Sequence, residues 1–403
     1  MMRELNLTNG IKTCIKKNAN TPRVALSMNF SIARPEEYPG QYLLMNRLLL
    51  KGTKKYSSEE LSAILDENAI DLYTEMKYDY LRFRFVALNE DFECALSILS
   101  DIIQNSTFEE FEKEKTKLKG EILAELDSAK VKVSDLFTKT IYKDHFYGHS
   151  YTTILNEIDN VTIDDIKSAY QNILTNSKKT LVLVGDVDTE SAELVLNKHL
   201  NTLPASVNVE SLISEPEFSS QNYVELIKDD AQQAQIIQGW RVASICTEDY
   251  PRLMLLNVIL GASGLSSRLF LELREKKGLA YTVRSSYETY MKSAVFSIYI
   301  GTEPSNIQTS IDGFKEEIEK IKTVLVSEEE LNNAKNNIIG KQQFITETNA
   351  QQANLMAYYA ITDRSFDYQK TVIDALKQVT AEELLECANK YFNDDYVLAI
   401  LKP

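Results

Sequence analysis

The sequence predicts an α+β fold made of two homologous duplicated domains, each an antiparallel-rich sheet with helices packed on one face. Two pairs of similar segments predict the duplication. ALSMNFSIARPEEYPGQYLLMNRLL is similar to AQIIQGWRVASICTEDYPRLMLLNVIL, and Tyr38 and Tyr250 within them lie 212 residues apart. NEIDNVTIDDIKSAYQNILTNSKKTLVLVGDV is similar to DALKQVTAEELLECANKYFNDDYVLAILKP, where Val161 and Val379 lie 218 residues apart. Matching offsets of this size indicate a repeated domain of about 200 residues.

The expected elements follow a similar order in both halves. A strand is expected at 23–33, then a long apolar helix, then a hairpin-like pair of strands at 72–88. Long helical patterns occupy 109–130 and, in the second half, 327–346. Each half closes with a capped amphipathic helix and an apolar strand. Strands mixed with long helices in this way predict a sheet layer covered by a helix layer.

A polar segment separates the two halves. NTLPASVNVESLISEPEFSSQNY, residues 201–223, contains two prolines and has only weak hydrophobic periodicity, which is typical of a linker. We therefore predict an N-terminal domain at 1–205, a linker at 206–222 and a C-terminal domain at 223–403.

Composition restricts the partners and the compartment. The formal net charge of −15 argues against nucleic acid and against anionic membrane surfaces as partners. The four cysteines lie far apart with no CxxC pair, so we interpret them as reduced thiols. The chain has neither a signal-peptide core nor an apolar run of about 18 residues that could span a bilayer. We expect a soluble, cytoplasmic protein.

The first long apolar helix resembles part of a known active site. GQYLLMNRLLLKGTKKYSSEELSAIL is similar to the segment around the inverted zinc motif HxxEH of the pitrilysin/insulinase peptidases, where Lys-Gly-Thr follows the motif and a second helix begins just after. With the Lys-Gly-Thr at 51–53 as the anchor, Leu43 stands at the first histidine, Asn46 at the glutamate and Arg47 at the second histidine.

These three residues cannot perform the chemistry of the motif. Two imidazoles at i and i+4 share a helix face and bind zinc, while a carboxylate beside the second deprotonates the bound water. Leucine cannot bind a metal, neutral asparagine cannot act as the base, and arginine puts a positive charge where the cation would lie. No shift of alignment restores the motif, because none of the three histidines precedes His145. We expect this chain to bind no zinc and no other cofactor.

The third zinc ligand of the family is a glutamate in a later helix, within a pattern that resembles ERxxVxxE. Here the region reads FEKEKTKLKGEILAELDSAK, which places Glu121 at the ligand position. Glu121 is either a solvated carboxylate or the partner of Arg47. We predict the ion pair, because a partly buried carboxylate without a counterion is costly.

The histidines do not offer a second metal site. His145 and His149 in KDHFYGHS lie four residues apart, but the Phe-Tyr-Gly between them and the polar flanks indicate a loop. His199 in LNKHLN ends a helix, where its charge would compensate the helix dipole.

The most specific resemblance lies at 260–288, LGASGLSSRLFLELREKKGLAYTVRSSYE. Arg274 and Tyr281 match the family's substrate-holding arginine and tyrosine, including their seven-residue separation, and the resemblance implies that the pair binds the peptide carbonyl and its developing charge. Without the family, Arg274 is a cation in the last turn of a helix, Gly278 is the C-cap and Tyr281 is an ordinary strand aromatic.

The resemblance covers nearly the whole chain and implies a function. In two-chain peptidases of the mitochondrial-processing-peptidase type, one subunit carries HxxEH and zinc and the other carries the arginine and tyrosine. The sequence has the features of the second kind: a non-catalytic, substrate-clamping subunit of a heterodimeric metallopeptidase with a closed chamber. Its partners would be an HxxEH-containing homologous subunit, which holds the zinc, and a peptide substrate.

Two other hypotheses remain. The chain could be a structural or peptide-binding scaffold of the same fold with no role in proteolysis. A self-sufficient enzyme would need other chemistry, and the sequence has no nucleophile motif, no Gly-rich phosphate loop and no CxxC. The isolated chain, which could pair with a second copy of itself, should leave peptides uncut.

Overall fold

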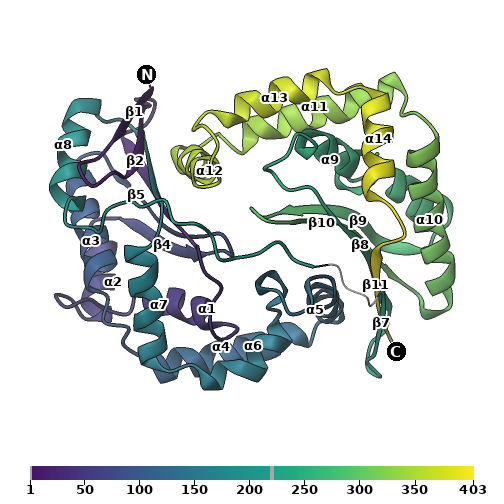
Figure 1. Cartoon of the computed structure of the whole chain (residues 1–403), viewed down its shortest axis with the longest axis horizontal. Helices are drawn as coiled ribbons and strands as arrows, with labels where there is room; N and C mark the ends of the chain where they lie inside the picture. The colour runs from purple at the N-terminus through teal and green to yellow at the C-terminus, as the bar shows by residue number, and fades with distance from the viewer. Residues whose placement is uncertain (1, 218–221) are drawn as a thin grey trace. The chain divides into compact units, whose positions relative to one another are not determined.

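The computed structural model describes residues 2–217 and 222–403, so the part of the predicted linker at 218–221 lies outside the described residues. The chain forms two compact units, each assembled from three segments (Figure 1). Unit 1 is Met1–Gly120, Ile154–Ile213 and Gln343–Tyr368, and unit 2 is Glu121–Thr153, Ser214–Gln342 and Gln369–Pro403. The units are therefore not contiguous halves of the chain, and the domain limits read from the sequence repeat stay a prediction.

Among the described residues, each unit contains one sheet. The strands are β1 (Met2–Asn6), β2 (Lys12–Lys17), β3 (Arg23–Ser31), β4 (Asp71–Met76), β5 (Tyr80–Leu88), β6 (Lys179–Gly185), β7 (Tyr223–Ile227), β8 (Ala234–Val242), β9 (Ala280–Thr289), β10 (Ala294–Thr302) and β11 (Tyr396–Lys402). The six-stranded sheet of unit 1 has the order β1-β2-β6-β3-β5-β4, and the five-stranded sheet of unit 2 has the order β7-β11-β8-β10-β9.

The two strand orders confirm the repeat. If β2 corresponds to β7, then β6, β3, β5 and β4 correspond in turn to β11, β8, β10 and β9, and β1 is an addition at one edge. The closing strand β6 pairs in parallel with β2 and antiparallel with β3, and β11 in the same way pairs in parallel with β7 and antiparallel with β8. The other strand pairs in the described residues are antiparallel, as predicted.

The helices occupy most of the remaining chain. They are α1 (Gln41–Leu48), α2 (Ser58–Glu67), α3 (Phe92–Asn105), α4 (Phe111–Leu126), α5 (Ala129–Tyr142), η1 (Phe146–Gly148), α6 (Tyr151–Glu157), η2 (Ile158–Asn160), α7 (Ile163–Thr175), α8 (Thr189–Leu200), α9 (Tyr250–Asn257), η3 (Val258–Ala262), η4 (Phe270–Lys276), η5 (Pro304–Asn306), α10 (Ile307–Thr323), α11 (Glu328–Phe344), α12 (Asn349–Ile361), α13 (Tyr368–Gln378) and α14 (Ala381–Tyr391). Within the described residues, no helix is long and apolar enough to cross a membrane.

The helix expected at 109–130 is in fact two helices. α4 ends at Leu126 and α5 begins at Ala129, after Ser128 takes an extended conformation. The hydrophobic pattern continues through this break, so periodicity alone does not reveal it. The strand pair at 72–88 is confirmed as the antiparallel pair β4–β5, and the helix at 327–346 as α11.

In each unit a helix from the other half of the sequence covers one face of the sheet. α12 packs on β3 and β6 of unit 1, where Ala353, Ala357 and Ala360 are buried against Val182 and Val184. The small alanines let the helix approach the sheet closely. Helices of the first half, such as α3, lie on the opposite face, where Phe92 contacts Phe85 of β5.

The corresponding helix in unit 2 is α5, which packs on β8 and β11. Phe137 of α5 lies over Gly239 of β8, where an added Cβ would come within 2.5 Å of the Phe137 Cζ atom. On the other face, Phe392 at the end of α14 packs on Trp240 and Phe296. The prediction that helices cover one face of each sheet therefore describes the helices from the same half of the sequence. The second face is covered by a helix from the other half, α12 in unit 1 and α5 in unit 2.

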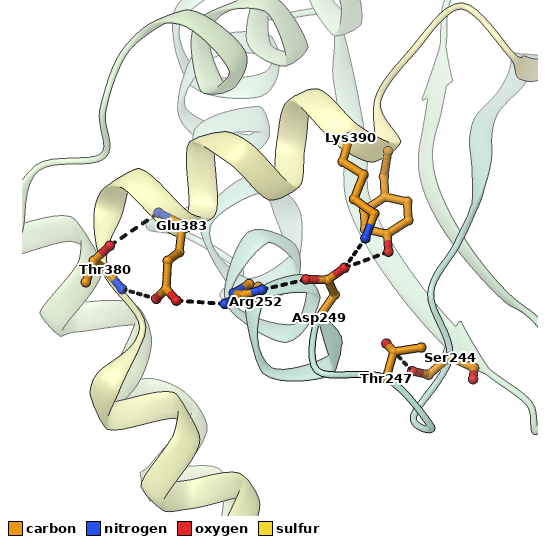
Figure 2. Close-up of polar contacts among 8 residues, drawn as sticks. Ser244, Thr247, Asp249, Arg252, Thr380, Glu383 and Lys390 are labelled. Carbon is orange, nitrogen blue, oxygen red and sulfur yellow. Dashed lines mark hydrogen bonds and ion pairs between the residues drawn. The ribbon is translucent and has the colours of Figure 1, made fainter.

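A chain of charged side chains joins α9 to α14 in unit 2 (Figure 2). Asp249 accepts hydrogen bonds from Arg252, Lys390 and Tyr391, each at 2.7 Å, and Arg252 also binds Glu383 at 2.7 Å. Burial favours the neutral form of Asp249, but the hydrogen bonds from Lys390, Tyr391 and Arg252 outweigh it and lower its pKa to about 2.

Replacing Asp249 should expose this contribution in the pH dependence of stability. The native pKa lies below the unfolded value, so the carboxylate stabilises the fold fully above about pH 5 and progressively less as the pH falls toward 2. Asp249→Asn should lower the free energy of unfolding at neutral pH by about 2 kcal/mol and flatten its pH dependence in this window. Chemical unfolding at a series of pH values measures both.

A matched control is Asp374→Asn, which removes an exposed ion pair with Lys377 within α13 and should change stability by less than about 1 kcal/mol. An Asp249→Asn protein with the same pH profile as the wild type would contradict the assignment.

Candidate functional site

Helix α1, which carries the zinc-motif positions, begins at a capped turn. The Glu36 carboxylate accepts hydrogen bonds from the backbone N–H groups of Gly40 at 3.0 Å and Tyr42 at 2.8 Å, which satisfies N–H groups that a helix start leaves unpaired. Gly40 has a φ of +89°, and a Cβ there would lie 2.6 Å from Ile154 Cγ2. Only glycine fits this position without strain.

Leu43, Asn46 and Arg47 share one face of α1, and all three are partly buried. The Asn46 carboxamide oxygen is buried and has no hydrogen-bond partner among the described residues. The backbone carbonyl of Asn46 accepts a bond from the Thr74 hydroxyl in β4 at 3.3 Å. This set offers one neutral oxygen, one aliphatic chain and one cation, which does not fit a zinc ion.

A buried carboxylate lies beside the residues of α1 that the sequence comparison aligns with the zinc motif. Arg47 Nε donates to Glu114 Oε2 of α4 at 3.0 Å, and Lys51 Nζ lies 3.0 Å from Glu114 Oε1. The Glu114 side chain is only 4% exposed. Burial raises the pKa of Glu114, but the hydrogen bonds from Lys51 and Arg47 outweigh burial, so the net pKa is lowered and the group stays ionised.

The sequence does not predict Glu114 as a partner of Arg47. The sequence contains one indication of this contact. Glu114 opens the stretch that resembles ERxxVxxE and lies seven residues, about two helical turns, before Glu121, so both carboxylates lie on the same side of the helix. The ion pair between Arg47 and Glu121 stays a prediction. Across the described residues, no group of three or more His, Cys, Asp or Glu side chains could hold a metal ion.

The histidines have structural roles. His145 Nδ1 accepts the Tyr147 N–H at 3.1 Å and His145 Nε2 lies 3.0 Å from the Ser214 carbonyl, so both nitrogens are engaged. Burial lowers the pKa of His145, in keeping with the neutral tautomer. The predicted loop is a short 3-10 turn, η1. His199, in the last turn of α8, binds Glu93 of α3 at 3.0 Å.

Arg274 and Tyr281 are brought together in unit 2. Arg274 lies in the π-helical segment η4, and its Nη1 atom donates to the Tyr281 backbone carbonyl at 2.6 Å. The guanidinium carbon lies 4.7 Å from the Phe270 ring centroid and 4.8 Å from that of Tyr281, so both rings make cation–π contacts with it. The C-cap of η4 is Lys277, one residue earlier than the sequence predicts, and Gly278 after it has a left-handed φ of +62° that ends the helix.

A β-bulge sets the position of Tyr281. Thr282 pairs with Gly301 of β10 and Ala280 pairs with Thr302, so Tyr281 is the extra residue without a partner in the register. Bulges of this kind redirect a side chain. Tyr281 is 79% exposed. The arrangement therefore presents a fixed guanidinium next to an accessible phenol.

Two family models match the chain. The model described as "Insulinase (Peptidase family M16)" matches residues 13–157, and "Peptidase M16 inactive domain" matches residues 160–338. The chain belongs to the peptidase M16 family. The zinc-motif positions lie in the first matched region, and Arg274 and Tyr281 lie in the second.

Relatives and solved structures agree with this M16 assignment. The chain is 25% identical to the "Uncharacterized zinc protease YmxG" of Bacillus subtilis, over 100% of this chain and 98% of YmxG. It is 23% identical to the "Probable inactive metalloprotease YmfF" of the same organism, over 80% of each chain. A peptidase M16 inactive domain from Pseudomonas fluorescens has the same fold, with a TM-score of 0.89, 20% identity and coverage of 100% and 98%. A Helicobacter pylori protease matches with a TM-score of 0.88 and 21% identity over both full chains.

Metal analysis should separate this M16 chain from HxxEH enzymes. Glu121 is the one ligand type retained at the three positions, and one carboxylate cannot make a three-ligand catalytic site. After dialysis against a weak chelator, mass spectrometry of the metal content should find zinc far below one per chain. One tightly held zinc per chain that is lost in Glu121→Ala would contradict this expectation.

Removing Arg47 alone should lower the free energy of unfolding more than removing the charges of Arg47 and Glu114 together. Arg47→Met leaves a buried carboxylate with one cation fewer and should lower the free energy of unfolding by roughly 1–3 kcal/mol. Arg47→Met combined with Glu114→Gln should recover part of that loss, as measured by urea unfolding. If the double variant loses the sum of the two single losses, the coupling between the side chains is absent.

Proposed function

We propose that this chain is the non-catalytic, substrate-clamping subunit of a heterodimeric zinc peptidase of the M16 family. The observation that carries the proposal is the contrast between two sites in one chain. The zinc-motif positions hold Leu43, Asn46 and Arg47, which have no zinc chemistry, whereas Arg274 and Tyr281 form an ordered pair with an accessible phenol. The family models, the relatives and the solved structures support an M16 fold of the inactive type.

The geometry of the pair suits a developing negative charge. One guanidinium N–H of Arg274 is used by the Tyr281 carbonyl, which fixes the plane of the group and leaves other N–H donors for a ligand. The Tyr281 hydroxyl can donate in the same neighbourhood because its ring contacts the guanidinium. Preorganised donors of this kind stabilise the oxyanion that forms when water adds to a peptide carbonyl.

The partner subunit would supply what this chain lacks. An HxxEH-containing M16 subunit would contribute the zinc, which polarises the carbonyl and activates the water, and the glutamate base. This chain would contribute the donors, the substrate contacts and half of the closed chamber. The proposal places the complex in the cytoplasm, because all four cysteines are free thiols, as expected in a reducing compartment.

The proposal is tested by reconstitution. Neither subunit alone should cleave an unstructured peptide, and the mixture should. Arg274→Ala or Tyr281→Phe should lower kcat/KM of the mixture by about 10²- to 10³-fold, because each donor acts chiefly in the transition state. Size-exclusion chromatography should show unchanged assembly with the partner.

Tyr223→Phe is the matched control, since it removes a half-exposed phenol in unit 2 that hydrogen-bonds Glu225 instead of contacting Arg274. It should leave the rate unchanged. The alternative function, a structural or peptide-binding scaffold without a role in proteolysis, is favoured by the loss of both zinc-binding histidines and the base. Full activity of the mixture with Arg274→Ala/Tyr281→Phe would refute the clamp role and favour a scaffold role.

A further inference from the structure

A hollow opens in unit 2 between α5 and the face of the sheet formed by β8, β9 and β10. Its volume is about 120 Å³. The strand alternation explains which side chains reach it. Val283 and Ser285 of β9 are buried toward the other face, while Arg284, Ser286 and Glu288 point to the face on which α5 lies.

A pair of small residues forms the floor of this hollow. Ser286 of β9 lies directly opposite Ser297 of β10. The next pair on one side is Arg284 with Tyr299, and both of these side chains line the hollow. The small pair therefore leaves a depression next to a larger pair. The depression therefore results from the sizes of the side chains on two paired strands and does not depend on the conformation of a loop.

One end of the hollow is positively charged. Lys130, in the first turn of α5, has its Nζ atom 5.4 Å from the centroid of the Tyr299 ring, and the Arg284 guanidinium carbon lies 5.8 Å from the same centroid. The Tyr299 hydroxyl donates to Gln235 at 2.6 Å, which fixes the ring between these groups. Both cations are exposed, and neither is paired with a carboxylate among the described residues.

The other end of the hollow is negative. Glu288 lies four residues beyond Arg284 on the same face of β9, which separates their Cα atoms by roughly 13 Å. An anion in the hollow is therefore attracted toward Lys130 and Arg284 and repelled by Glu288. Two unpaired cations beside one ring are unusual in a chain with a formal charge of −15, where carboxylates outnumber lysines and arginines.

Size and lining restrict the ligand. A hollow of about 120 Å³ admits an amino-acid side chain or chain end, whereas whole small ligands usually occupy about 300–1,000 Å³. Apolar side chains such as Phe137 and Ile141 line it together with the charged groups, as expected for a site that takes part of a peptide. Glu288 at the other end of the hollow repels anions in proportion to their charge, so it disfavours a doubly charged phosphate more than a singly charged carboxylate.

We propose that this hollow binds a carboxylate group of a peptide, with Lys130 and Arg284 as its counterions. The carboxylate could belong to an aspartate or glutamate side chain or to a peptide C-terminus. The inference rests on the proposed function for the identity of the ligand as a peptide. It adds a preference for acidic or C-terminal segments that the Arg274–Tyr281 pair, which faces a backbone carbonyl, does not provide.

Binding to the isolated chain tests the proposal directly. Three acetylated peptides of equal length and otherwise neutral sequence are compared by ligand-observed NMR titration: one with an internal glutamate and an amidated end, one with glutamine and a free C-terminal carboxylate, and one with glutamine and an amidated end. At least one of the first two should bind about 10-fold more tightly than the third. The tighter of the two identifies the source of the carboxylate.

Charge variants connect the preference to the hollow. Arg284→Gln and Lys130→Gln should each reduce the preference about threefold or more, and the double variant should abolish it. Glu288→Gln is the matched control in the same hollow, and it should preserve or increase the preference. Raising the salt concentration should weaken it, because the cations are open to solvent. Thermal unfolding checks that every variant is folded.

Equal binding of the three peptides, or no binding of any, would overturn the proposal, as would a preference that survives in the double variant. These outcomes are independent of reconstituted peptidase activity. A carboxylate preference without activity in the mixture would refute the clamp function and leave the binding site intact. Activity without a carboxylate preference would do the reverse.

Discussion

The burial of both sheet faces by helices from the two halves of the chain is the constraint on which each unit depends. A sheet with two apolar faces needs cover on both, because exposed apolar area costs about 25 cal/mol per Å². In unit 1 the second face is covered by α12, and in unit 2 by α5. Neither sheet is complete without a segment from the other half of the sequence. The hollow between α5 and the sheet of unit 2 exists because α5 lies along that face.

The two regions proposed as sites differ in their chemistry. On α1, Arg47 has a buried anionic partner, because Arg47 and Lys51 together balance the charge of the ionised Glu114. These ion pairs connect α1 and the residue Lys51 just after it to α4. In unit 2, the bulge at Tyr281 and the π-helical segment around Arg274 are local irregularities that regular strand and helix geometry would remove. Irregularities of this kind are found preferentially at functional sites.

Local patterns were enough to predict most elements and the family. Several features depend only on neighbouring residues and can therefore be read from the sequence. They are the apolar and polar residue types that alternate in parts of β3 and β5, the capping boxes of α7 and α14, and the repeated segments. The sequence does not predict the break at Ser128, because the apolar pattern continues across it, nor the exchange of α5 and α12, because an amphipathic helix does not specify which sheet it covers.

The candidate sites also divide into features that the sequence predicts and features that only the structure shows. The resemblance identifies Arg274 and Tyr281 as a pair, and the structure adds the cation–π contacts with Phe270 that hold the guanidinium. The hollow at Ser286 and Ser297 depends on contacts between residues far apart in the chain, for which a single sequence carries no signal. The pairing of Glu114 with Arg47 is indicated in the sequence only by the position of Glu114, two helical turns before Glu121.

The central claim is that Arg274 and Tyr281 act on the transition state of a reaction whose zinc lies in another subunit. Its most direct test is the affinity of the reconstituted pair for a phosphinic peptide, a tetrahedral mimic of the transition state, compared with that for the uncleaved peptide. The account predicts that Arg274→Ala weakens binding of the phosphinic peptide by about the same factor by which it lowers kcat/KM, with little change for the substrate peptide. Equal affinity of the phosphinic peptide for the wild-type and Arg274→Ala pairs would contradict it.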